Sequence, residues 1–180
     1  SFSSIKHILT RNEQGAAHMA SGYARVTKQA GVCTATSGPG ATNLITGIAT
    51  AYMDSIPMVA LTGQVATKLI GKDAFQEVDI TGATLPFTKH SYLIKDGLDI
   101  PRVVNEAFHI ANTGRPGPVL IDFPMDLLKK EFDYPDEDED VNIRGYKLMG
   151  KANESQVKKV AEAIKGAKKP VILAGGGVVI

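Results

Sequence analysis

The sequence contains a single cysteine, Cys33, among its 180 residues, so an intrachain disulfide is impossible. A reducing, cytoplasmic setting is therefore expected. The formal net charge is only +1, which argues against the basic surface of a nucleic-acid-binding protein. No apolar run approaches the roughly 18 residues of a membrane-spanning helix, and no basic-then-apolar leader opens the chain. These absences favour a soluble globular protein that binds neither nucleic acid nor membrane.

The signature motifs of several enzyme classes are also missing. The chain has no P-loop, no H-E-x-x-H zinc helix, no G-x-S-x-G nucleophile turn and no paired-cysteine metal pattern. Glycines 175–177 do not fit G-x-G-x-x-G with its following helix and acidic residue, so a Rossmann site is unsupported. The four histidines are scattered and are expected to be structural. No metal-binding residue is predicted.

Apolar runs alternate with helical patterns along the first part of the chain. Strands are predicted at residues 5–9, 31–35, 57–62, 89–94 and 118–123. Helices are predicted at residues 13–29, 40–53 and 100–113, the last one capped by Asp99. Residues 63–85 have no clean period and are expected to form a long loop with short helical pieces. This alternation indicates an α/β fold with a parallel sheet flanked by helices on both faces.

The pattern changes at an acidic run, residues 136–140, which follows Pro135. Such a block repels itself and is usually a solvated linker. Beyond it, residues 155–165 have an amphipathic helical pattern and residues 170–174 a strand pattern, which predicts a second α/β unit. Both ends of the chain look cut. We therefore expect a fragment with one domain at 1–130, an acidic linker at 131–151 and the start of a second domain at 152–180.

Two local patterns are candidates for chemistry. Glu13 stands at the start of a predicted helix, where carboxylates are common simply because they complement the helix dipole. Residues 37–40 form a Ser-Gly-Pro-Gly turn between a strand and a helix, whose N–H groups could face an anion or a ring. A tight turn needs glycine in any case. Cys33 lies in a strand and is expected to be a small buried hydrophobe. These residues alone do not define a reaction.

Taken together, four segments resemble the large catalytic subunits of the acetolactate synthase family. These segments are residues 11–20, residues 36–43 with 49–57 behind them, residues 62–65 with 73–77, and residues 114–119 with 122–124. The resemblance covers about residues 5–126. It implies that residues 1–130 form an N-terminally incomplete pyrimidine-binding domain for thiamine diphosphate. It also implies that residues 152–180 begin a central, flavin-associated domain.

The resemblance implies a thiamine-diphosphate-dependent transferase of branched-chain amino-acid biosynthesis. Such an enzyme decarboxylates pyruvate and joins the product to a second 2-oxo acid, pyruvate or 2-oxobutyrate. The products are 2-acetolactate and 2-aceto-2-hydroxybutyrate. Glu13 would be the catalytic residue, hydrogen-bonded to N1′ of the aminopyrimidine ring, where it relays a proton. Opposing effects act on its pKa, since burial would raise it and the helix start would lower it.

Further site residues are assigned by the same resemblance. The cofactor-binding residues would be Glu13, Gly38, Pro39, Gly40, Asn43 and Arg115, of which Arg115 would contact FAD. Phe75 and Gln76 would approach the substrate from the long loop. The Mg2+ that accompanies thiamine diphosphate would bind outside this segment. Three positions depart from the family pattern, with Asn12, Ala66 and Met125 where His, Pro and Lys are usual.

Two other functions remain open at this point. One is another thiamine-diphosphate enzyme, such as a pyruvate oxidase or a 2-oxo-acid decarboxylase, although residues 73–77 do not look like the decarboxylase pattern. The other is a non-catalytic relative that kept the fold. The implied partners are 2-oxo acids and a second copy of the full-length chain, in a homodimer or larger oligomer, with a small regulatory subunit left open. Since the active site of this family forms between subunits, residues 1–180 alone are expected to be inactive.

Overall fold

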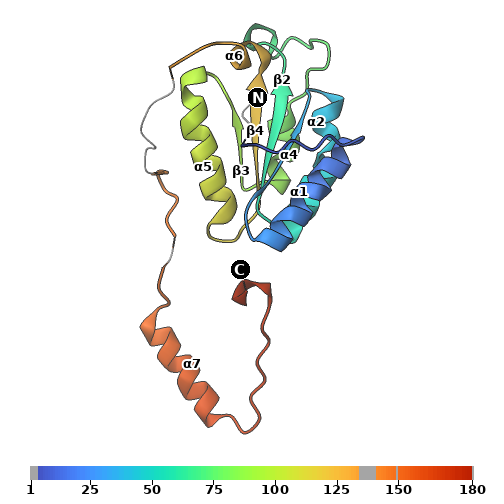
Figure 1. Ribbon diagram of the computed structural model, residues 1–180. Coiled ribbons are helices and arrows are strands. Elements are labelled where there is room, and N and C mark those ends of the chain that lie inside the picture. The colour runs from blue at the N-terminus through green and yellow to red at the C-terminus, as the bar shows by residue number, and fades with distance from the viewer. Residues whose placement is uncertain (1–3, 134–140, 149, 180) are drawn as a thin grey trace. The chain divides into compact units, whose positions relative to one another are not determined.

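The computed structural model describes residues 4–133, 141–148 and 150–179 (Figure 1). The chain divides into two units, Ser1–Asn142 and Ile143–Ile180. The acidic run at residues 136–140, predicted to be a linker, lies outside the described residues. No helix in the described ranges is long and apolar enough to cross a membrane.

The first unit is built on a parallel sheet of four strands. Across the sheet the order is β1 (Gly31–Ala35), β2 (Met58–Gln64), β4 (Pro118–Pro124) and β3 (His90–Leu93). Met58 pairs with Gly31 on one side and with Pro118 on the other, so three strands begin at the same level. Parallel neighbours need long crossover connections, which the helices supply. This arrangement confirms the α/β fold predicted from the sequence.

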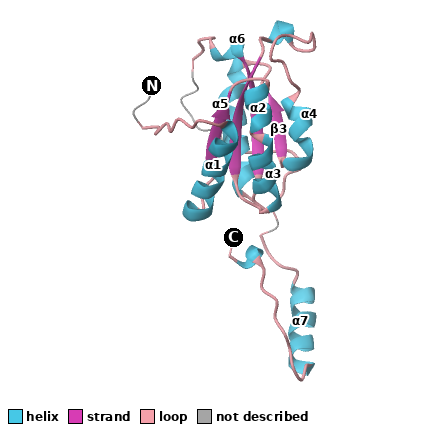
Figure 2. Ribbon diagram, turned by 90° about the vertical axis from the view of Figure 1, so that its right-hand side faces the viewer, coloured by secondary structure: helices cyan, strands magenta, loops and turns pink. Residues whose placement is uncertain are grey.

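Helices cover both faces of the sheet (Figures 1 and 2). One face is covered by α1 (Glu13–Thr27), α2 (Pro39–Asn43), α3 (Ile45–Met53) and α4 (Ile80–Thr84). The other face carries α5 (Ile100–Asn112), which packs on β4, β2 and β3. Strand side chains alternate between these layers, so Ala60 and Leu120 join the first core while Val59 and Val119 point the other way. Cys33 belongs to the first core, as predicted, and burial raises the pKa of its thiol to about 12.

Small residues let α1 lie close to the sheet. Ala17, Ala20 and Ala24 are buried on its inner side. Gly31 of β1 is in such close contact that a Cβ there would lie 2.0 Å from the Ala20 carbonyl oxygen. At the start of α1, the Oδ1 of Asn12 accepts hydrogen bonds from the backbone N–H groups of the second and third helical residues, at 2.8 and 3.3 Å. Asparagine is among the best N-cap residues, so Asn12 stabilises the start of α1.

The long segment between β2 and β3 contains short helical pieces, as predicted. These are η1 (Thr67–Leu69), α4 and η2 (Leu85–Phe87). A further short helix, α6 (Met125–Leu128), follows β4 at the same end of the sheet (Figure 1). The single helix predicted at residues 40–53 is divided into α2 and α3 at Leu44. The segments that follow β1, β2 and β4 therefore gather above one edge of the sheet.

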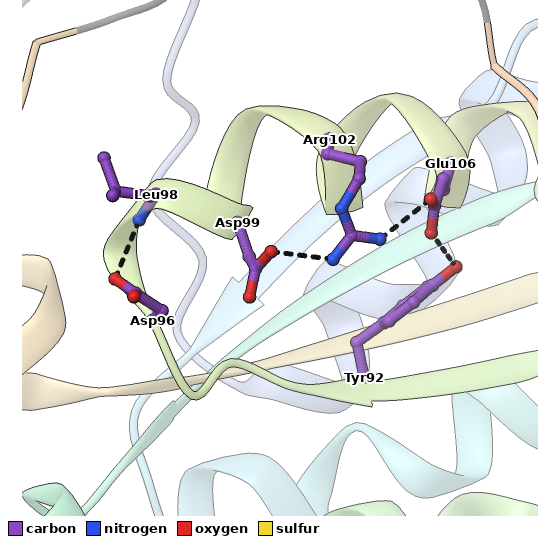
Figure 3. A network of polar contacts seen from close by, with 6 residues as sticks. All are labelled: Tyr92, Asp96, Leu98, Asp99, Arg102 and Glu106. Carbon is purple, nitrogen blue, oxygen red and sulfur yellow. Dashed lines mark hydrogen bonds and ion pairs between the residues drawn. The ribbon is translucent and has the colours of Figure 1, made fainter.

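A chain of polar contacts connects α5 to β3 (Figure 3). Arg102 donates to Asp99 at 2.8 Å and to Glu106 at 2.9 Å. Glu106 also accepts a hydrogen bond from the hydroxyl of Tyr92 at 2.8 Å. These contacts raise the pKa of Arg102, chiefly through its hydrogen bonds to the two carboxylates. The network holds the first two turns of α5 against the edge strand.

Asp99 takes the N-cap position of α5, as predicted, but it does not cap the helix with its side chain. Asp99 precedes the helix, but its side chain makes no capping hydrogen bond. Its backbone is already helical, at φ −78° and ψ −15°, because the 3-10 turn η3 (Gly97–Asp99) runs directly into α5. The side chain of Asp96 caps the 3-10 turn η3, and it accepts from the N–H of Leu98 at 3.2 Å (Figure 3). A side chain caps best from an extended backbone, and Asp96 has one.

Two predicted strands were wrong. Residues 5–9 form no strand, and Ile5 and Leu9 are 75% and 83% exposed. Residues 170–174 form none either, with Val171 and Leu173 more than nine-tenths exposed. An apolar run becomes a strand only beside a hydrogen-bonded neighbour, and no described segment pairs with either run.

The second unit contains one helix of regular length, α7 (Glu154–Gly166), and a 3-10 turn, η4 (Gly176–Val178). Asn153 caps α7 in the same way that Asn12 caps α1, with Oδ1 accepting from two backbone N–H groups at 3.0 and 3.3 Å. The described residues 143–148 and 150–179 include no strand. The helix predicted at residues 155–165 is confirmed.

Candidate active site

Most of the predicted site residues lie at the edge of the sheet where the strands end. Residues 36–40 directly follow β1, residues 65 and 66 follow β2, and residue 125 follows β4. Helix α1 begins at this same edge, because it packs along β1 and its last residue connects through a short turn to the start of that strand. Ligands of open α/β sheets bind at this carboxyl edge.

Glu13 and Asn43 meet here although they are far apart in the sequence. Asn43, the last residue of α2, donates from Nδ2 to Oε2 of Glu13 at 3.1 Å. The pKa of Glu13 is lowered, first by this hydrogen bond and then by its own backbone N–H, while burial opposes with a smaller effect. The carboxylate is half-buried and ionised at neutral pH. The structure thus decides between the opposing effects that the sequence left open.

The glycine turn brings bare backbone next to this carboxylate. A Cβ on Gly40 would lie 2.7 Å from Cγ2 of Thr36 and 3.7 Å from Oε1 of Glu13. Gly38 has φ +58° and ψ −119°, a conformation that favours glycine. Pro39 takes the first position of α2, where its fixed φ suits a helix start. The positive φ of Gly38 and the close approach of Thr36 to Gly40 therefore explain the two glycines of this turn.

The long loop lies against the same turn. A Cβ on Gly38 would come within 2.7 Å of the carbonyl oxygen of Gln76. Phe75, the neighbouring residue, is 89% exposed and extends into solvent. The structure therefore brings the backbone of Gln76 to the glycine turn, and the substrate role of Phe75 and Gln76 stays a prediction.

The carboxylate of Glu77 stabilises the conformation of the long loop. Glu77 accepts hydrogen bonds from the N–H groups of Gly71 and Ala74, the latter at 2.9 Å, and these bonds lower its pKa. Asp73 and Gln76 both have left-handed backbone, with φ of 52° and 60°. Non-glycine residues rarely adopt this conformation, and it persists where the surroundings compensate for its cost. The hydrogen bonds of Glu77 provide such compensation.

Arg115 is not part of this group. Its Nε donates to Oγ of Ser55 at 2.7 Å, and its guanidinium also reaches the carbonyl oxygen of Met53 at 3.4 Å. Ser55 precedes β2 and Arg115 precedes β4, so this contact lies at the amino edge of the sheet. The length of β2, about 20 Å at 3.3 Å per residue, separates this edge from Glu13.

Three buried polar residues near the site received no role from the sequence. Thr62 pairs with Asp122 across β2 and β4, and both are 1% exposed. Thr62 donates from Oγ1 to Asp122 at 2.6 Å, and Gln64 donates from Nε2 to the other carboxylate oxygen at 2.9 Å. The sequence feature that could have identified these residues is Asp122, an acid within the otherwise apolar strand β4, because a buried carboxylate needs hydrogen-bond partners.

Asp122 gives a prediction about pH. Burial raises the pKa of Asp122 to about 6, while the hydrogen bonds from Thr62 and Gln64 act in the opposite direction. An unfolded aspartate has a pKa near ~3.9, so the native state retains this proton after the unfolded chain has lost it. The contribution of Asp122 to stability therefore falls as pH rises from about 4 to about 6, by roughly 2–3 kcal/mol.

The variant Asp122→Asn isolates this effect, because its side chain does not titrate. Urea unfolding of both proteins across this pH range should show wild type losing stability relative to the variant as pH rises. A constant difference between the two proteins would contradict the raised pKa. Comparison with the variant is necessary because acids with lowered pKa, such as Glu77 and Asp79, act in the opposite direction.

The described residues include no group of three or more His, Cys, Asp or Glu side chains that could hold a metal ion. The contacts described above join one ionised carboxylate, one amide, a glycine turn and the long loop. Such a set can hold and orient a planar nitrogen heterocycle and exchange a proton with it.

Comparisons with known proteins identify similar sequences. Residues 1–83 match the family described as thiamine pyrophosphate enzyme, N-terminal TPP binding domain. By their fold and by this match, residues 1–83 are similar to the N-terminal cofactor-binding domain of thiamine pyrophosphate enzymes.

More particular relatives extend the similarity to nearly the whole chain. It is 54% identical over 177 residues to an acetolactate synthase of Arthrospira platensis, a match covering 98% of the chain and 31% of that protein. It is 56% identical to an acetolactate synthase of Mycobacterium bovis, covering 97% of the chain and 28% of the relative. A large subunit of acetolactate synthase from Buchnera aphidicola is 55% identical, with 97% and 31% covered. The chain is thus similar to acetolactate synthase large subunits over nearly its whole length, which confirms the resemblance, and it spans about three-tenths of their length.

Proposed function

We propose that this chain is part of the catalytic subunit of an acetolactate synthase. The observation that carries the proposal is the ionised Glu13, held by Asn43 beside the side-chain-free Gly40 at the carboxyl edge of the sheet. The reaction is decarboxylation of pyruvate and transfer of the product to a second 2-oxo acid, pyruvate or 2-oxobutyrate. This reaction belongs to the biosynthesis of valine, leucine and isoleucine, in the cytoplasm.

The residues at this edge fit the pyrimidine end of thiamine diphosphate. One oxygen of Glu13 is engaged by Asn43, and the carboxylate lies at the start of a capped helix that fixes its position. Gly40 keeps the space beside the other oxygen free of a side chain. When bound, the cofactor supplies the electron sink for decarboxylation of a 2-oxo acid. Glu13 holds and moves a proton at the ring nitrogen N1′, and Asn43 orients Glu13 for this task.

Other residues have roles around this proton relay. Gly38 and Pro39 shape the turn that faces the cofactor, and Phe75 and Gln76 contact the substrate. Arg115, at the opposite edge, binds the FAD of a flavin-dependent synthase, where a guanidinium suits a phosphate group. The FAD contact is thus separate from the proton relay, in keeping with a structural flavin. The Mg2+ site lies in a part of the enzyme outside this segment.

The proposed domain organisation is the one predicted from the sequence. Residues 1–130 form the pyrimidine-binding domain, residues 131–151 an acidic linker, and residues 152–180 begin the central domain. The complete subunit forms a homodimer or a larger homo-oligomer, since each active site combines domains of two subunits. A small regulatory subunit is a further candidate partner.

The test is the product formed from pyruvate by the complete polypeptide that carries this segment, with and without added FAD. Acetolactate that depends on thiamine diphosphate and FAD is expected. Acetaldehyde would instead identify a 2-oxo-acid decarboxylase, and acetyl phosphate a pyruvate oxidase. Residues 1–180 alone should form no product and bind thiamine diphosphate weakly, and acetolactate formation by this segment would contradict that expectation.

A further inference from the structure

The loop that carries Phe75 and Gln76 is attached to the sheet by side chains at its two ends. At its beginning, Asp126 of α6 accepts hydrogen bonds from the N–H and the hydroxyl of Thr67, at 2.9 and 2.6 Å. Near its end, the carbonyl oxygen of Val78 accepts a hydrogen bond from Nε2 of Gln64 at 2.8 Å. The second attachment lies two residues from Gln76, so it bears directly on the substrate-facing pair.

Gln64 is built to hold one orientation. It ends β2 and is 6% exposed. Its Nε2 donates to Asp122 at 2.9 Å and to Val78, and its Oε1 accepts from the N–H of Val65 at 2.8 Å. A carboxylate and a carbonyl face the amide nitrogen while an N–H faces the amide oxygen, so only one orientation of the amide satisfies all three partners. The side chain of Gln64 therefore links strand β2 to the loop in one fixed orientation.

The sheet end of this link is itself buried and fixed. Asp122 is held between Gln64 and Thr62, and strand pairing keeps Thr62 opposite Asp122. A buried carboxylate with two donors resists displacement, because losing either partner leaves a polar group unsatisfied. Gln64 thus transmits the position of the rigid sheet to a loop that otherwise lies on the surface.

The other contact of the loop leads to the catalytic carboxylate. Gln76 packs its backbone on Gly38, in the same turn whose Gly40 lies beside Glu13. Moving the end of the loop would move Gln76 off this turn and change the position of Phe75. The cofactor contacts of Glu13 and Asn43 would remain, since they do not involve the loop.

We propose that Gln64 is a positioning residue that sets the place of Phe75 and Gln76 over the glycine turn, by joining Asp122 to the backbone of Val78. Gln64 does not itself contact the substrate. This inference rests on the proposed function for its kinetic consequence, but its structural consequence can be measured without any reaction. The role predicts an effect on substrate binding that is separate from cofactor binding.

Two variants of the complete polypeptide distinguish this role from general stability. Gln64→Met removes both donations and keeps an unbranched side chain, whereas Thr62→Val removes a donation to the same carboxylate without touching the loop. In Gln64→Met the KM for pyruvate should rise about tenfold, while the Kd for thiamine diphosphate stays within about twofold. In Thr62→Val both constants should match those of wild type. Equal KM changes in the two variants would overturn the proposal.

Hydrogen exchange gives the readout that does not depend on activity. Within residues 71–80, the backbone N–H groups of Gly71, Ala74, Glu77 and Ile80 are hydrogen-bonded. Their exchange should be about tenfold faster in Gln64→Met and unchanged in Thr62→Val. Unchanged exchange in Gln64→Met would overturn the positioning role even if the enzyme is active. Absence of acetolactate in wild type, with the exchange result as expected, would instead contradict only the proposed function.

A double variant covers the case in which Gln64→Met fails to fold because Asp122 has lost a partner. Gln64→Met/Asp122→Asn removes the buried charge but still leaves the carbonyl oxygen of Val78 without the hydrogen bond from residue 64. Its KM for pyruvate should remain raised and its loop exchange fast. Return of both to wild-type values would show that the buried charge, and not the link to Val78, accounts for the effect, and would overturn the proposal.

Discussion

Replacing Glu13 by glutamine should reduce acetolactate formation by the complete enzyme at least about 100-fold. The amide can still accept the hydrogen bond that Asn43 donates, at 3.1 Å in the structure, so the fold and the helix start should be retained. It cannot take up or release a proton at the ring nitrogen, which is the step assigned to Glu13. The loss should appear in kcat, measured at saturating pyruvate, thiamine diphosphate and FAD.

The matched control is Glu154→Gln. Glu154 occupies the first position of α7 after Asn153, just as Glu13 follows Asn12 at the start of α1, and both asparagines cap their helices. Both glutamates complement a helix dipole, but only Glu13 is joined to Asn43. Glu154→Gln should leave kcat unchanged. If Glu13→Gln keeps activity within about fivefold of wild type, general acid–base catalysis by this residue is excluded.

Replacing Gly38 by alanine should have the largest effect on stability at the site. The residue has φ +58°, and the added Cβ would lie 2.7 Å from the carbonyl oxygen and 3.0 Å from the Cα of Gln76. Backbone strain and a collision with backbone atoms combine, and backbone cannot move aside as a flexible side chain does. We expect a loss of about 3 kcal/mol in the free energy of unfolding.

Gly71→Ala separates the two causes. Gly71 lies in the long loop that carries Gln76 and also has positive φ, +79°, but a Cβ there would have nothing within 4 Å. This variant should lose only about 1 kcal/mol, from backbone strain alone. Urea unfolding of both variants measures the difference. Equal losses would mean that the contact between the turn and the loop contributes little, and the packing of Gln76 on Gly38 would then not restrain the loop.

The main elements of the fold could be predicted because they depend on local patterns. The alanines at helical spacing predicted α1, and the short apolar runs predicted β1, β2, β3 and β4. The failures at residues 5–9 and 170–174 have a common cause. Their composition suits a strand, but a strand requires a neighbour to accept its hydrogen bonds, and periodicity does not report whether one exists.

Helix caps show a second limit of prediction from the sequence. Asp99 has the residue type and the place of an N-cap, yet the preceding 3-10 turn gives it helical backbone and its side chain makes no capping hydrogen bond, while Asp96 caps the 3-10 turn. The motifs of the resemblance located Glu13, the glycine turn and the loop in the sequence. The order of these motifs along the chain does not give the distances between them in space. They also assigned Arg115 to the same enzyme without indicating that it lies at the other edge of the sheet.

The sequence by itself determined the α/β class, the run of small residues in α1 and, through its motifs, the relation to acetolactate synthase large subunits. These depend on residue type and spacing along the chain, which are local properties. Only the tertiary structure decided that Asn43 meets Glu13 and lowers its pKa, that Gln76 rests on Gly38, and that Gln64 joins Asp122 to Val78. The physical reason is that each of these contacts joins segments from different elements of the fold, and their meeting follows from the order of strands in the sheet and the packing of helices upon it.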